Sequence, residues 1–238
     1  RIVDWLDTKK GYLVAIGIWS VGAMIHAFCG IATSGIITGN WLVGFEGAKD
    51  SIALVSKTSL ITSVSVALFV FARFVLALGE AGNFPAAIKA TAEYFPKKDR
   101  AFSTSIFNAG ATVGALAAPV TIPFIAKAWG WEASFLIIGA LGFVWMGIWV
   151  FSYKKPEGHP SVNAAELHYI HQDNDQDIIA LGNLTGRNKT SFLACFKYRQ
   201  TWAFAFGKFM TDGVWWFFLF WTPAYLSSVY KMDSTQSA

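Results

Sequence analysis

Charged residues are scarce in this sequence of 238 residues: Asp, Glu, Lys and Arg together make up 14% of it, against about 25% in an average soluble protein. Since 54% of the residues are hydrophobic and the mean hydropathy is +0.43, this scarcity excludes an ordinary soluble domain and predicts an integral membrane protein. Cysteine is scarce as well, and Cys29 and Cys195 indicate no disulfide framework. The sequence opens at Arg1 with neither an initiator methionine nor a signal peptide, so we expect a fragment of a longer protein.

Five apolar stretches are long enough to cross a bilayer as helices, which takes about 20 residues. They are residues 11–33, 60–92, 102–126, 132–153 and 202–226. The predicted fold class is therefore an all-α integral membrane protein with five transmembrane helices.

Most of the 19 Lys and Arg residues fall on one side of these predicted spans if the N-terminus is cytoplasmic. That side comprises residues 1–10, 93–101 and 154–200, and such an excess of positive charge is typical of cytoplasmic loops. The bias excludes a nucleic-acid partner, because the charge is spread along one membrane face. The lipid bilayer is the expected surrounding.

Residues 154–200 form a polar segment, which we predict to be a cytoplasmic linker between two membrane units. Pro156 ends the preceding helix, and Ser161 is expected to cap a short amphipathic helix through the sequence AAELHYI. His168 and His171 lie three residues apart but have no further ligand at suitable spacing, so no metal site is predicted.

Arg73 and Glu80 lie near the middle of the second predicted span, in the sequence RFVLALGEAGNFPAA. A charged residue at the centre of a spanning helix costs roughly 2.5–3.5 kcal/mol and usually faces the interior of a bundle. Seven residues return to nearly the same helix face but rise about 10.5 Å, too far for direct pairing. The guanidinium then suits a carboxylate ligand, and the buried carboxyl group suits a proton. A structural ion pair with another helix is the alternative.

Two asparagines are further candidates for this site. Asn83 either binds a ligand or bonds the backbone carbonyl that Pro85 leaves free. Asn108 in the third span lies about as far from the cytoplasmic end as Glu80 does, and we expect it to line the same cavity.

Small residues in the same spans indicate close helix packing. Gly79 and Gly82 flank Glu80, and Gly110, Gly114 and Ala118 form a stripe with a spacing of four residues. For the stripe we predict a packing role first.

The last span contains Lys208 and Asp212, which are spaced to pair along a helix. Asp212 and Gly213 also predict a helix break near the middle of the span. Trp215 and Trp216 follow, and an indole ring beside a polar break suits the C–H face of a sugar ring. Asp212, Trp215 and Trp216 are therefore candidate substrate-binding residues, with Lys208–Asp212 as a structural pair left open.

With these residues in place, the whole chain resembles the major facilitator superfamily and, within it, the anion:cation symporters of hexuronates. The opening RIVDWLDTKKGY resembles the gating loop between helices 2 and 3 of that family, with Asp4, Lys9 and Lys10 at matching positions. Trp5 and Asp7 depart from the usual Arg and Gly there. The sequences ATAEYFPKKDRA and GKFMTDGVWWFFLFWTPAYL are similar to hexuronate-type members.

The resemblance implies that the five spans are helices 3 to 7 of twelve. Residues 1–153 would be part of the N-terminal six-helix half, 154–200 the linker, and 201–238 the start of the C-terminal half with helix 7. A monomer in the bacterial inner membrane is expected.

The resemblance also implies import of a sugar-acid anion, such as glucuronate or galacturonate, by proton symport through alternating access. Arg73 would contact the substrate carboxylate and Glu80 would carry the proton, with the transmembrane proton gradient and no cofactor as the energy source. Symport of another organic anion (a hexonate, glucarate or an aromatic acid) and an anion channel or uniporter stay open. An enzyme is not expected, because no nucleophile with a base is visible in the spans.

Overall fold

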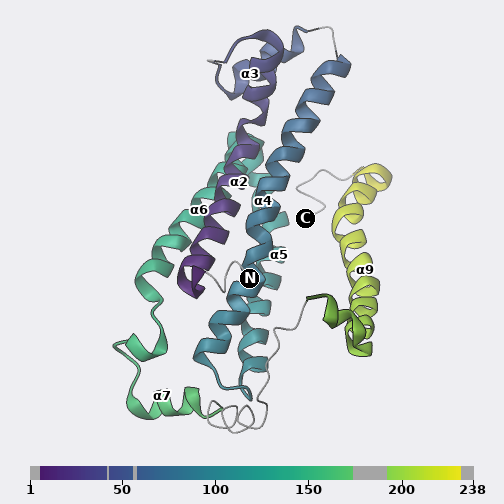
Figure 1. Cartoon of the computed structure of the whole chain (residues 1–238). Coiled ribbons are helices and arrows are strands. Elements are labelled where there is room, and N and C mark those ends of the chain that lie inside the picture. Colours follow the sequence, from purple (N-terminus) through teal and green to yellow (C-terminus); the bar gives the residue numbers. More distant parts are fainter. Residues whose placement is uncertain (1–5, 42, 56–57, 174–191, 232–238) are drawn as a thin grey trace. The chain divides into compact units, whose positions relative to one another are not determined.

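The computed structural model describes residues 6–41, 43–55, 58–173 and 192–231, and in these ranges the chain forms helices and no strand (Figure 1). The predicted all-α class is confirmed. The long helices are α2 (Thr8–Thr38), α4 (Thr58–Tyr94), α5 (Arg100–Trp129), α6 (Trp131–Ser152) and α9 (Arg199–Tyr230). The shorter segments are α3 (Phe45–Ala53), α7 (Ala164–His171) and the 3₁₀ turns η1 (Pro156–Gly158) and η2 (Phe192–Lys197).

Four helices of the described chain, α2, α4, α5 and α6, are long and apolar enough to cross a membrane. They contain or closely match the first four predicted spans. The fifth predicted span lies in α9, whose 32 residues give a length of about 48 Å. Helix α9 is not among these four helices, and the fifth span stays a prediction.

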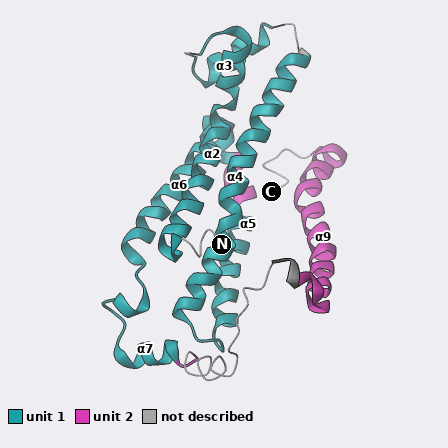
Figure 2. Ribbon diagram, viewed as in Figure 1, with its two compact units in different colours: residues 1–115, 124–171 teal, residues 116–123, 172–238 magenta. Residues whose placement is uncertain are grey.

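The chain divides into two compact units (Figure 2). The first comprises residues 1–115 and 124–171, and the second comprises residues 116–123 and 172–238. The first unit continues to His171, beyond residue 153, where the sequence predicted the linker to begin. The division into transporter halves stays a prediction.

Helix α2 is the centre of the first unit: it packs against α4 and α6 along its length and against α3 at one end (Figure 1). Glycine permits the close approach. A Cβ atom at Gly79 would come closer than 3.0 Å to backbone atoms of Trp19, and one at Gly142 would meet the Ser20 hydroxyl. Gly79 therefore has a packing role against α2.

The stripe on α5 differs from these glycines. A Cβ atom at Gly110 or Gly114 would meet no described atom within 4 Å, apart from the backbone of its own helix. The predicted packing role of this stripe stays a prediction.

Aromatic rings join α2 to the second half of α6. Tyr12 lies edge-on to Trp145 and Trp149, with ring centroids 4.8 Å and 4.9 Å apart. Trp149 stacks on Trp145 at 5.2 Å and on Tyr153 at 4.3 Å. The stack carries the packing of α6 to the point where the helix ends.

Helix α9 runs without interruption from Arg199 to Tyr230, so the predicted break at Asp212 and Gly213 is wrong. The physical reason lies one turn earlier. Lys208 Nζ and Asp212 Oδ1 are 2.8 Å apart, an ion pair that supports a helix. One interior glycine costs only about 1 kcal/mol, which a long helix tolerates.

The short helix predicted within the polar segment is present as α7, but Ser161 does not cap it. The Oδ1 atom of Asn163 accepts a hydrogen bond of 2.8 Å from the backbone N–H of Glu166, which is the capping geometry. Helix α7 then contacts the loop between α4 and α5: Tyr169 donates to Asp99 at 2.6 Å, and Lys98 Nζ lies 4.5 Å from the Tyr169 ring centroid.

Candidate functional site

Arg73 and Glu80 lie on the same side of α4. Ala72 and Gly79 are buried against α2, and each charged residue follows one of them by a single position, about 100° further around the helix. Both side chains are exposed. Neither forms an ion pair with any residue in the described part of the chain.

Asn83 is one turn beyond Glu80 and lines two cavities in the first unit. Its side-chain oxygen is buried and accepts no hydrogen bond from the described residues. This oxygen is available as an acceptor for a ligand, and the two predicted roles of Asn83, ligand binding and a bond to the backbone freed by Pro85, stay predictions. The larger cavity has a volume of about 360 Å³ and lies between α2, α4 and α6, lined by Tyr12, Ile16, Trp19, Asn83, Ile138, Leu141, Gly142 and Trp145.

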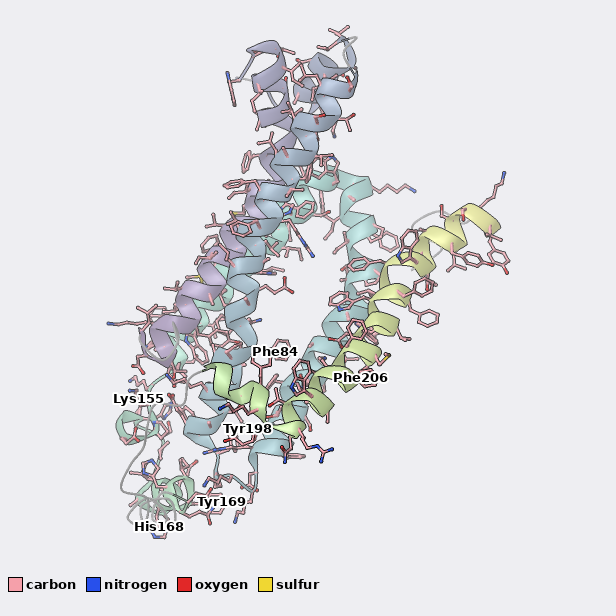
Figure 3. All side chains as sticks on the ribbon, turned by 45° about the vertical axis from the view of Figure 1, so that its right-hand side comes forward. Phe84, Lys155, His168, Tyr169, Tyr198 and Phe206 are labelled. Carbon is pink, nitrogen blue, oxygen red and sulfur yellow. The ribbon has the colours of Figure 1, made fainter. Side chains whose placement is uncertain are left out.

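The smaller cavity has a volume of about 180 Å³ and shares Tyr12 and Asn83 with the larger one. Its other lining residues are Phe84, Ala87, Phe107 and Ala111. The ring of Phe84, labelled in Figure 3, lies 6.0 Å from that of Phe107 on α5. Arg73 and Glu80 line neither cavity, so their shared chamber stays a prediction.

Asn108 is exposed on α5, and its backbone carbonyl accepts a hydrogen bond of 3.2 Å from Thr112 Oγ1. It lines neither of the two cavities. That Asn108 lines a common cavity with Glu80 stays a prediction.

The candidates of the last span lie on α9, in the second unit. Trp216 stacks on Phe220 at 5.5 Å, and Trp215 is 57% exposed. Asp212 is paired with Lys208, which favours the structural interpretation of these two charges. A joint site with Arg73 on α4 stays a prediction.

Of the predicted gating residues, Lys9 and Lys10 lie in the first turn of α2. Asp4 falls outside the described residues, and Lys10 is exposed. Lys9 Nζ donates a hydrogen bond of 2.8 Å to the backbone carbonyl of Val150 near the end of α6. This contact joins two helices of the first unit.

Sequence reasoning missed Glu93, in the last turn of α4. Its Oε1 atom accepts a hydrogen bond of 2.5 Å from Thr8, and its Oε2 atom accepts one from the Tyr153 hydroxyl. Burial raises the pKa of Tyr153 well above its ordinary value, and the hydrogen bond to Glu93 adds to this. No pattern in the sequence could have found the cluster, because its partners are 85 and 60 residues away from Glu93.

Asp7 and Lys155 form an ion pair of 3.1 Å beside this cluster. The hydrogen bond from Lys155 lowers the pKa of Asp7, and the same bond raises the pKa of Lys155. Another ion pair, Lys49–Glu132 at 3.0 Å, joins α3 to the start of α6, and the Glu132 side chain is only 5% exposed.

Comparison with known proteins identifies the class. The family model of the Major Facilitator Superfamily matches residues 51–238, and the chain belongs to this family. With its four apolar helices, the chain is part of a multi-pass protein of the bacterial inner membrane.

The more specific likeness is to transporters of sugar acids. The chain is 29% identical over 237 residues to the hexuronate transporter of Escherichia coli strain K12, covering 100% of this chain and 46% of that protein. It is 31% identical over 237 residues to the galacturonate transporter of Dickeya chrysanthemi, covering 100% and 58%. A probable galactarate/D-glucarate transporter of E. coli is 33% identical over 162 residues, covering 66% and 36%. The chain thus spans about half the length of the first two relatives and 36% of the third. Their names agree with the prediction of a transporter and not of an enzyme.

Proposed function

We propose that the protein is a secondary active transporter that imports a hexuronate, such as glucuronate or galacturonate, together with a proton. The observation that carries the proposal is the pair Arg73 and Glu80, which share one side of an apolar helix and have no ion-pair partner among the described residues. The names of the relatives at 29% and 31% identity support a sugar acid as the substrate.

In this proposal Arg73 binds the substrate carboxylate, since the planar guanidinium fits a carboxylate with two hydrogen bonds. Glu80 carries the proton, because a neutral carboxylic acid crosses an apolar environment at lower cost than a carboxylate. Asn83, with its unsatisfied buried oxygen, offers an acceptor to a sugar hydroxyl.

Coupling follows from the cost of moving unpaired charges through the switch between outward and inward states. With both substrate and proton bound, Arg73 and Glu80 are neutralised, and alternating access proceeds. With one alone, a charge stays uncompensated. The transmembrane proton gradient supplies the energy, we propose no cofactor, and the functional unit is a monomer.

The test is uptake by the full-length protein in proteoliposomes. Glu80→Gln mimics the protonated carboxyl group, so uphill uptake driven by a pH gradient is expected to vanish while exchange of labelled for unlabelled hexuronate persists. Uphill uptake that survives Glu80→Gln overturns the role of Glu80.

A second candidate is symport of a different organic anion. It is favoured by the similarity to relatives named as probable transporters of galactarate or D-glucarate and of sulfoacetate. A competition panel of hexuronates, hexonates, aldarates and sulfonates against labelled glucuronate distinguishes the two. Flux that neither saturates nor requires a proton would indicate a channel instead.

A further inference from the structure

One carboxylate joins the ends of three membrane helices in the first unit. Glu93 lies in the last turn of α4, Thr8 begins α2, and Tyr153 directly follows α6. Each oxygen of Glu93 accepts one hydrogen bond, from the hydroxyl of Thr8 and from that of Tyr153. Thr8 is fully buried and Tyr153 is 5% exposed, so both donors are buried, whereas Glu93 itself is half-buried and the two hydrogen bonds are partly accessible to water.

Two residues that follow Tyr153 are also bound to α4 and to the start of α2. The Tyr94 hydroxyl donates to the backbone carbonyl of Lys154. Lys155, labelled in Figure 3, is paired with Asp7. Together with the bond from Lys9 to Val150, these contacts hold the end of α6 and the residues that follow it against α2 and α4.

We propose that Glu93 is a positioning residue for transport: it locks the segment Tyr153–Lys155 to α2 and α4, so that this segment moves with the three helices as one body. The proposal rests on the proposed function for its effect on transport. The attachment of Tyr153–Lys155 to α2 and α4 is independent of the proposed function, because it follows from the hydrogen bonds and the ion pair described above.

The position of Glu93 separates it from substrate binding. It lies 20 residues after Arg73 on the same helix, a rise of about 30 Å, so it does not touch a ligand held by Arg73. Its loss is therefore expected to slow the conformational step while substrate affinity is retained. The carboxylate suits this task because it offers an acceptor to two hydroxyl donors at once, whereas an amide has a single acceptor oxygen.

The experiment uses the full-length protein in proteoliposomes, with Glu93→Gln, Glu93→Ala and Tyr153→Phe compared with Glu166→Gln. The control makes the same change at an exposed residue of α7. We expect the maximal uptake rate to fall by about tenfold or more in Glu93→Ala, because this change removes both hydrogen bonds to the carboxylate. The KM for hexuronate is expected to stay within about twofold of the unmodified protein, because ground-state binding is untouched. A raised KM with an unchanged maximal rate overturns the proposal.

A second measurement needs no substrate. Spin labels at Lys10 and Lys154, both exposed, report the distance between the start of α2 and the fastened segment, in a background where the exposed Cys195 is serine. We expect a narrow distance distribution that broadens in Glu93→Ala and in Tyr153→Phe and stays narrow in Glu166→Gln. An unchanged distribution in both variants overturns the proposal.

The two proposals fail separately. An unmodified protein that takes up no hexuronate refutes the proposed function, and the distance distributions still decide whether Glu93 locks the segment. If Glu93→Ala does not accumulate in membranes, Tyr153→Phe still decides, because it removes one hydroxyl and keeps the ring that stacks on Trp149.

Discussion

Gly79 of α4 lies so close to Trp19 of α2 that a Cβ atom at position 79 would come within 3.0 Å of the Trp19 backbone nitrogen. The backbone of a helix cannot turn aside as the end of a side chain can. The contact between Gly79 and Trp19 therefore fixes the distance between α2 and α4, and Glu80 is the next residue along α4.

We expect Gly79→Ala to destabilise the first unit by about 1–3 kcal/mol, the usual cost of an added methyl group in a packed interface. Gly110→Ala is the matched control, since its Cβ would meet no described atom beyond its own helix within 4 Å. Thermal unfolding of both purified variants in detergent measures the difference. Equal melting temperatures would contradict the close packing.

Arg73→Met is expected to leave stability within about 0.5 kcal/mol of the unmodified protein, because no described residue forms an ion pair with Arg73. Hexuronate binding is expected to weaken roughly ten- to 100-fold through the loss of charged hydrogen bonds. Thermal unfolding and binding of labelled glucuronate measure the two effects.

Arg100→Met is the matched control for Arg73. Arg100 donates to the carbonyls of Phe95 and Ala92, so its replacement is expected to lower the melting temperature without weakening hexuronate binding. Loss of stability in Arg73→Met equal to that in Arg100→Met would show that Arg73 has a structural partner after all.

Lys49→Met removes the partner of a buried carboxylate. Glu132 is left without its ion pair, and we expect a loss of about 1–3 kcal/mol, below the value for a fully buried pair because Lys49 is half exposed. Lys127→Met changes an exposed lysine in the last turn of α5 and is expected to have little effect. Chemical unfolding curves of the two variants measure the difference. Equal denaturant midpoints for Lys49→Met and Lys127→Met would contradict a stabilising role of the Lys49–Glu132 pair.

The Asp7–Lys155 pair predicts a dependence of stability on pH. The lowered pKa of Asp7 contributes stability that is present above the unfolded value of about 3.9 and is lost as the pH falls through the folded pKa. The raised pKa of Lys155 contributes stability that is present below about 10.4 and is lost as the pH rises through the folded pKa.

Asp7→Asn is therefore expected to lower the melting temperature slightly at neutral pH, and its difference from the unmodified protein is expected to shrink as the pH falls below about 3.9. The effect is small because both side chains are about half exposed. Melting curves at pH 3, 5 and 7 test this, and a difference that grows as the pH falls would refute the assigned sign.

The positions of the long helices could be predicted from the sequence because a spanning helix requires a long apolar run, and such runs are visible without knowledge of their partners. Their ends lie only a few residues from the predicted ends. The cap of α7 was misplaced by two residues because Ser161 and Asn163 are both good capping residues, and only the backbone geometry selects Asn163.

The break expected at Asp212 failed for a related reason: a local pattern for a turn was outweighed by an ion pair within the helix. Glu93 lay beyond sequence reasoning, since Thr8 and Tyr153 are distant in the chain and only the packing of α2, α4 and α6 brings them together. Arg73 and Glu80 could be singled out because an uncompensated charge in an apolar run is costly in any fold.

Tyr12 and Asn83 line both cavities of the first unit. A larger or smaller side chain at either residue is therefore expected to change the volumes of both cavities together. Leu141 borders the larger hollow alone, and Phe84 borders the smaller alone. Substitutions at Leu141 are therefore expected to change the volume of the larger cavity alone, and substitutions at Phe84 that of the smaller cavity alone.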